Sequence, residues 1–179
     1  MTPDNIIHFW FTEIAPVAWW TVDPEFDRLL TERFGDLLRR AAAAELYAWR
    51  SDARGRLAEI IVLDQFSRNV CRNTAQAFAQ DAMALALAQE AVASGAHRVL
   101  AAVERAFLLL PYMHSESRLI HVQAEVLFRE FAPPGNFDSE LRHKAIVDRF
   151  GRYPHRNALL GRRTTPEEAE FLKTPGSSF

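Results

Sequence analysis

The stretch LAEIIVLDQF, residues 57–66, contains seven apolar residues out of ten. Its side chains are hydrophobic almost all round a helix, which predicts a helix buried at the centre of the protein. Because an unpaired buried carboxylate is costly, we expect Asp64 to have partners, and Arg68 lies one helical turn further on. Two interpretations stay open: a structural network that ties helices together, or a pocket lined by Asp64, Arg68 and Asn69 whose burial shifts their ionisation.

Helix signals recur on both sides of this segment. Thr2-Pro3-Asp4 and Asp23-Pro24-Glu25 each place a capping oxygen before a proline at the first helical position, which predicts helices to about residues 11 and 44. A capping box at residues 165–168 predicts a short last helix, with Glu168 facing solvent. The other predicted helices cover residues 74–94 (stopped by Gly95), 98–110, 116–131 and 138–150.

No half-buried strand pattern of any length interrupts these helices, so the predicted fold class is all-α. Short connections between paired helices favour a tetratricopeptide-like αα-superhelix or a compact stack of helical hairpins, although no clean 34-residue repeat is visible. At 179 residues and 49% hydrophobic, one domain is expected. We predict a single helical domain over residues 1–172 and a loosely ordered tail over residues 173–179.

Composition predicts a cytoplasmic protein with no membrane partner. The first residues, MTPDNIIHFWF, lack the basic and long apolar regions of a signal peptide, and no apolar run approaches the ~18 residues of a membrane helix. The single cysteine, Cys71, cannot form an internal disulfide. Arg68 and Arg72 flank it and favour a reactive thiolate, but no base is identifiable, so we interpret Cys71 as a packing residue.

Positive charge is concentrated in one part of a chain whose net charge is −2. Residues 142–163 hold seven Lys or Arg against one acid. Within them, the loop at residues 149–157 precedes an expected short helix at 158–160, and a helix N-terminus at Asn157 beside Arg152 and Arg156 would suit an anion. In the alternative interpretation, which we call the internal staple, the arginines of the loop form ion pairs with acids elsewhere in the chain and so hold the fold together. The candidate acids are Asp64, Asp81, Glu104 and Glu116.

The segment after Pro111 supplies further candidates. Glu116 and Gln123 are seven residues apart, which predicts that both border the core-facing stripe of one helix. His114 precedes that helix and is either a loop histidine held by the core or a general acid or base, with Glu116 orienting its imidazole. The candidate catalytic residues are His114, Glu116 and His155. The candidate ligand-binding residues are Asp64, Arg68, Asn69, Gln123, Arg152, Arg156 and Asn157.

Metal, cofactor and nucleic-acid signatures are not found, and none of these partners is predicted. His143 lies on the buried stripe of its helix, where a lone histidine is usually a satisfied core residue. Glu140 and His143 form one Glu-x-x-His pair, whereas a di-iron bundle needs two. The sequence also lacks zinc spacings, phosphate loops, the dinucleotide fingerprint, the Gly-x-Ser-x-Gly elbow and RNA-binding strings.

Several strings, in order, carry a resemblance to a known family. They are HFWF at 8–11, LDQFSRN at 63–69, FAQD at 78–81, ERAF at 104–107, HSE at 114–116 with Gln123, and RFGRYPHRN at 149–157. Together they resemble the bacterial domain-of-unknown-function 924 family from the first helix to Leu172. The resemblance implies an all-helical fold similar to tetratricopeptide superhelices and no established reaction, substrate or cofactor. The chain departs from the family pattern at Ser67 and Asn73, where Pro and Gly are usual, and at Cys71, where an aromatic residue is common.

Three classes of function remain open from the sequence. The first is a polar cleft for a small anionic metabolite, with acid–base or hydrolytic chemistry. The alternative is a tetratricopeptide-like module that binds a peptide or protein on its concave face without catalysis; a regulatory or structural protein with no small ligand is a third. Buried His, Asp, Glu and Arg would favour chemistry, whereas exposed Asn, Lys and aromatic residues along a groove would favour peptides.

Overall fold

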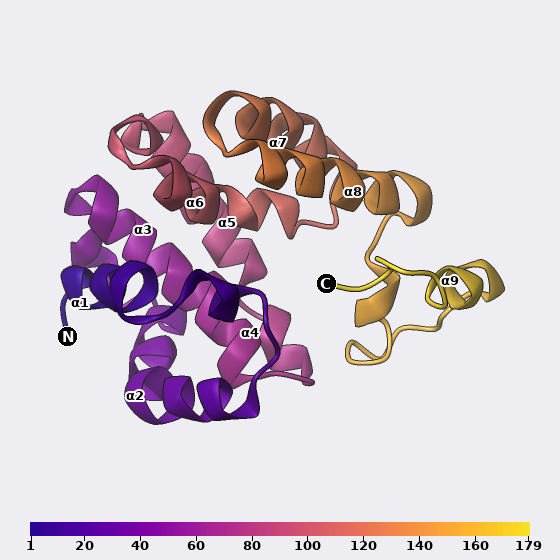
Figure 1. The fold of residues 1–179 in the computed structure, drawn as a ribbon, viewed down its shortest axis with the longest axis horizontal. Helices are drawn as coiled ribbons and strands as arrows, with labels where there is room; N and C mark the ends of the chain where they lie inside the picture. Colours follow the sequence, from indigo (N-terminus) through magenta and orange to yellow (C-terminus); the bar gives the residue numbers. More distant parts are fainter.

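The computed structural model describes residues 1–179, which form α-helices and short helical turns without any β-strand (Figure 1). The all-α prediction is confirmed, while the tetratricopeptide-like arrangement stays a prediction. None of the helices is long and apolar enough to cross a membrane. The α-helices are α1 (Pro3–His8), α2 (Pro24–Ala42), α3 (Ala53–Ile61), α4 (Ser67–Val70), α5 (Asp81–Ala93), α6 (Ala102–Met113), α7 (Arg118–Phe131), α8 (Pro134–Phe150) and α9 (Pro166–Phe171).

The predicted central helix is the structural centre of the N-terminal part. Helix α3 continues through a π-helical turn, Val62–Phe66, into α4, and α1, α2, α5 and α6 pack around this continuous rod. Leu57, Ile60, Leu63 and Phe66 have no exposed surface, and full burial of such a side chain is worth about 1.5–3 kcal/mol. The same rod carries Asp64 into the interior, where it has 1% of its surface exposed.

The starts of α2 and α9 follow their local signals, whereas the helices predicted over residues 98–110 and 138–150 begin at Ala102 and Pro134. Asp23 accepts a hydrogen bond from Glu25 N at 2.9 Å, and Thr165 caps α9 through Glu168 N. The predicted helix over residues 74–94 is divided into a 3₁₀ turn, Ala75–Phe78, and α5. Gly95 ends α5 with a left-handed φ of 77°, as expected. The expectation that Glu168 faces solvent is wrong: it is 2% exposed and binds Arg152 with both carboxylate oxygens.

Helix α6 passes through Pro111 instead of ending before it. A proline inside a helix lacks an N–H and crowds the carbonyl four residues before it, but the helix continues here, since His114 N closes the last turn on Leu110 O at 2.9 Å. His114 therefore becomes the C-cap of α6, and α7 begins at Arg118, two residues later than predicted. Glu116 lies in the connection between α6 and α7, and Gln123 is exposed on α7. The shared core-facing line predicted for Glu116 and Gln123 does not form.

Helices α7 and α8 pack side by side, and the chain beyond them forms turns and α9 at the opposite end of the molecule from α1 and α2 (Figure 1). A second, small core of Ile146, Val147 and Tyr153 holds this end together. The expected helix at residues 158–160 is absent, since these residues form turns. In residues 173–179, the Ser177 hydroxyl donates to Leu172 O at 3.1 Å; the single-domain division at 172 and the loose tail stay predictions.

Candidate functional site

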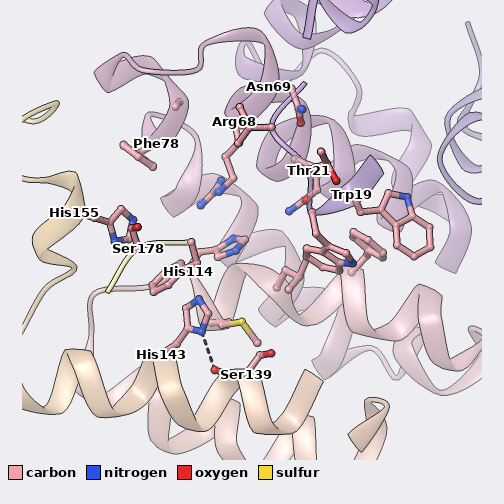
Figure 2. A pocket seen from close by; sticks show the side chains of 18 of the residues that line it. Trp19, Thr21, Arg68, Asn69, Phe78, His114, Ser139, His143, His155 and Ser178 are labelled. Atoms are coloured by element: carbon pink, nitrogen blue, oxygen red, sulfur yellow. Dashed lines mark hydrogen bonds between the residues drawn. The ribbon is translucent and has the colours of Figure 1, made fainter. Parts of the chain in front are cut away.

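A cavity of about 980 Å³ lies between the N-terminal helices and the C-terminal segment (Figure 2). One part of its wall is apolar and includes Trp19, Trp20, Phe107 and Leu110. The other part is polar. It comprises Arg68 and Asn69 from α4, His114 from the end of α6, Ser139 and His143 from α8, and His155 and Arg156 from the 3₁₀ turn Pro154–Arg156. The wall therefore suits a molecule with one apolar and one polar end.

Asp64 holds His114 from behind the cavity wall. The His114 Nδ1 atom lies 2.7 Å from Asp64 Oδ1, and no protein group bonds to His114 Nε2. Burial and the nearby Arg68 lower the pKa of His114, although Asp64 opposes them. Burial alone would raise the Asp64 pKa, but Arg68 and His114 hold it below its usual value. At neutral pH the imidazole is uncharged, donates Nδ1–H to Asp64 and keeps a free lone pair on Nε2.

Two guanidinium groups continue this network along the cavity wall. Arg68 Nη1 lies 3.1 Å from Asp64 Oδ1 and 2.9 Å from Asp81 Oδ1. Arg156 Nη1 lies 3.1 Å from Asp81 Oδ2, so Asp81 bridges the two arginines. Asp64 is thus part of a structural network, as one interpretation of the sequence expected. Of the three residues that the other interpretation placed in a pocket wall, Arg68 and Asn69 line the cavity and Asp64 does not.

Arg156 and His155 keep polar atoms without partners. The Arg156 guanidinium lies 4.6 Å from the centroid of the Phe78 ring and 4.7 Å from that of Tyr153. Its Nε atom and His155 Nδ1 are both buried with no hydrogen-bond partner. Arg156 and His155 both line the cavity, whereas other buried polar atoms without a partner, such as both ring nitrogens of His97, lie away from it.

Two further imidazoles are kept neutral by burial. Burial lowers the pKa of His143 to about 3 and that of His155 to about 4, with Arg156 adding to the second shift. His143 Nδ1 donates to Ser139 O at 2.8 Å. His143 is therefore a satisfied, buried histidine, as its stripe predicted, yet it also lines the cavity.

Four of the predicted site residues lie elsewhere. Glu116 accepts hydrogen bonds from Arg162 at 2.6 and 2.9 Å and from Tyr153 N at 2.7 Å, so it does not orient His114; Asp64 has that position. The side chain of Arg152 pairs with Glu168 (Oε1 at 2.6 Å, Oε2 at 2.8 Å). Arg152 therefore forms an ion pair within the protein, as the internal-staple interpretation expected.

Asn157 belongs to the same staple, and Gln123 lies apart from it. Asn157 is fully buried; its amide donates to Glu168 Oε2 at 3.2 Å and its Oδ1 accepts from Arg162 Nε at 3.0 Å. It therefore opens no helix and presents no anion site. Gln123 is exposed on α7 and does not line the cavity.

Metal-ligand geometry is not seen around the Glu-x-x-His pair. Glu140 Oε1 lies 2.7 Å from His121 Nδ1, while the Nδ1 atom of His143 binds Ser139 O. No group of three or more His, Cys, Asp or Glu side chains is arranged to hold a metal ion. Cys71 lies outside the cavity, and burial raises the pKa of its thiol, which agrees with a packing role.

Sequence reasoning missed the aromatic lining of the cavity. Trp19, Trp20, Phe78 and Phe107 look like ordinary core residues in the sequence, because apolar side chains in a core and in a cavity wall follow the same pattern. The position of His143 on a core-facing stripe predicted its burial, but no local sequence feature indicates that this stripe faces a cavity. Phe179 lies in residues 173–179, which carry no helix signal.

The fold and this polar cavity define an all-helical protein with a buried histidine and arginine site. The family model described as "Bacterial protein of unknown function (DUF924)" matches residues 6–176. The chain belongs to this family, which confirms the sequence resemblance. It is also similar to a solved structure, the protein of unknown function ATU0120 from Agrobacterium tumefaciens, at 36% identity and a TM-score of 0.90 over 96% of each chain. No curated protein matches the sequence.

Proposed function

We propose that this protein binds a small amphipathic anion in the cavity and acts on it with His114 as a general base or acid. The observation that carries the proposal is the buried Asp64–His114 pair, whose free Nε2 lies on a wall shared with two guanidinium groups. A carboxylate on Nδ1 keeps one tautomer and stabilises the imidazolium that forms when Nε2 accepts a proton. The lowered pKa of His114 supports the base form at neutral pH.

Hydrolysis by an activated water is the reaction type that these residues support best. No cysteine lines the cavity, and none of the hydroxyl side chains in its wall, Thr21, Ser139 and Ser178, is hydrogen-bonded to His114. His114 would therefore activate water or remove a proton from the ligand, without forming a covalent intermediate on the protein. His155, with a buried and unpartnered Nδ1, is positioned as the second proton-transfer group.

Arg156 is the main candidate for holding the anionic group. Its Nη1 pairs with Asp81, but its Nε has no partner, and a charge-assisted hydrogen bond to a carboxylate or phosphate is worth roughly 1.5–3 kcal/mol. Arg68 lies on the other side of Asp81. Exposed Arg142 on α8, which also lines the cavity, adds positive charge near the opening.

A peptide-binding module is the second candidate function, because Trp20 and Val22 are 62% and 68% exposed at the cavity edge. A tetratricopeptide-like concave face would present such side chains to a peptide. By the criterion that the sequence suggested, the buried His143 and Arg156 favour the small-molecule proposal over this alternative.

Ligand binding is tested by a thermal-shift screen of carboxylate and phosphate metabolites, in which stabilisation should grow with ligand concentration. Arg156 is 5% exposed, so Arg156→Gln should lower the melting temperature as well as abolish the shift. Arg152→Gln is the matched control. Arg152 lies in the same loop as Arg156 and also forms an ion pair, with the buried Glu168 of α9, but it does not line the cavity. Loss of the ligand shift in both variants, or no shift with any anion, would contradict the binding proposal.

Catalysis is tested with carboxylic ester, amide and phosphate monoester substrates. His114→Gln should reduce turnover by about 10²–10⁴-fold, the usual contribution of a general base. His97→Gln should leave it unchanged, since His97 is another buried histidine that does not line the cavity. If turnover does not depend on His114, the catalytic role is wrong while the binding role stands on its own test.

A further inference from the structure

Phe179 extends into the cavity and lies against three other rings. Its ring centroid is 3.7 Å from that of His143, 4.7 Å from that of His155 and 5.1 Å from that of Tyr153. The Tyr153 and His155 contacts are nearly edge-on, at 88° and 75°. We call the space between His143, Tyr153 and His155 the ring slot. Ser178, the neighbour of Phe179, also lines the cavity (Figure 2).

Two of the three walls of the ring slot are held by hydrogen bonds, and both histidines of the slot are uncharged at neutral pH. His143 is held by Ser139 O, and Tyr153 by the bond from its hydroxyl to Met113 O. Burial keeps His143 and His155 neutral, with pKa values of about 3 and about 4. Such a slot holds a flat aromatic group well, because edge-to-face and offset contacts add to the gain from burial.

A cation lies next to the ring slot. The Arg156 guanidinium is 4.7 Å from the centroid of Tyr153, whose ring also contacts Phe179. Arg156, whose Nε has no partner, and Phe179 line the same cavity. A molecule that uses both features has an aromatic ring joined by a short linker to a carboxylate or phosphate.

Phe179 is weakly attached to the site it fills. It is 53% exposed, and neither Ser178 nor Phe179 makes a hydrogen bond with the rest of the chain. The nearest polar anchor is Ser177, through Thr174 O and Leu172 O. The ring can therefore leave the slot without breaking a polar contact.

Resting on the proposed function, we infer that the cavity takes aryl-substituted anions and that Phe179 occupies their aryl subsite. A ligand of this class binds by displacing the Phe179 ring, so residue 179 competes with it. Non-aromatic anions bind at Arg156 without entering the ring slot and do not meet this competition.

The test measures the affinity of 3-phenylpropionate, phenyl phosphate, propionate and inorganic phosphate by NMR titration at pH 7.5. The proteins are the unmodified chain, Phe179→Ala and the control Phe171→Ala, whose ring packs on Phe150 outside the cavity. Phe179→Ala should bind the aryl ligands about 3- to 10-fold more tightly, the factor expected from removing one competing aromatic contact. It should bind propionate and phosphate as the unmodified chain does, and Phe171→Ala should change none of these affinities.

The outcomes separate this inference from the proposed function. Unchanged or weaker aryl binding in Phe179→Ala, or an equal gain for propionate, overturns the aryl subsite even if anions bind and Arg156→Gln abolishes their binding. If no anion binds any of the proteins, the proposed binding function fails and the inference fails with it. A gain for only one of the two aryl ligands supports the inference and identifies the anionic group as carboxylate or phosphate.

Discussion

Replacing Asp64 by Asn tests the central polar network most directly. The carboxylate is 1% exposed and contacts Arg68 at 3.1 Å, His114 at 2.7 Å and the Gln65 amide. Asparagine keeps the size of the side chain but removes its charge. The change therefore isolates the electrostatic contribution of this carboxylate from its packing.

The size of the effect follows from the partners that remain. Arg68 keeps Asp81 and a hydrogen bond to Asp64 O at 2.7 Å, but Arg68 and Arg156 then share one carboxylate. Breaking a buried ion pair costs about 3–5 kcal/mol, and the residual partners of Arg68 point to the lower end, about 3 kcal/mol. Since a domain of this kind is stable by about 5–15 kcal/mol, the loss is a large part of the total.

Urea unfolding at pH 7 measures this loss. With a urea dependence of about 1–3 kcal/mol per M, the Asp64→Asn midpoint should fall by roughly 1 M or more. Glu32→Gln is the control, because Glu32 forms an i,i+4 pair with Arg28 in which both side chains are 61% exposed; such pairs contribute about 0.3–0.5 kcal/mol. Equal, small shifts in the two variants would show that the buried network does not stabilise the fold.

Acid stability and a glycine contact give the remaining predictions. His143 and His155 are protonated in the unfolded chain below pH ~6.5 but neutral in the folded chain down to pH values of about 3 and about 4, so unfolding takes up protons. The free energy of unfolding should therefore fall from pH 7 toward pH 4, by up to about 1.4 kcal/mol per pH unit for each histidine; a slope that is no shallower in the variant with both histidines replaced by Gln would contradict this cause. Gly55→Ala would place a Cβ 1.9 Å from Trp49 O and should cost about 3 kcal/mol or more in thermal or urea unfolding. Gly35→Ala, with nothing within 4 Å of the new Cβ, should instead stabilise α2 by about 0.5–1 kcal/mol, and similar effects at the two glycines would contradict the contact.

Helical structure and burial were predictable because their causes are local. A capping side chain followed by proline sets the starts of α1, α2 and α9, since cap and helix are covalent neighbours. The predominantly apolar run of residues 57–66 is hydrophobic almost all round a helix, so its central position follows from its composition. The same run showed that Asp64 needs partners, and Arg68 at i+4 was identifiable from helical spacing.

The composition of the site was decided by tertiary packing. Asp64 and His114 are 50 positions apart, and Arg156 and Asp81 are 75 positions apart, so no local pattern relates them. Glu116, two residues from His114, was the partner that sequence proximity favoured. Because α6 continues through Pro111 to Met113, His114 caps that helix and meets Asp64, while Glu116 pairs with Arg162 in the next connection. Helix length and packing angle set such long-range pairs, and both depend on contacts that the whole fold supplies.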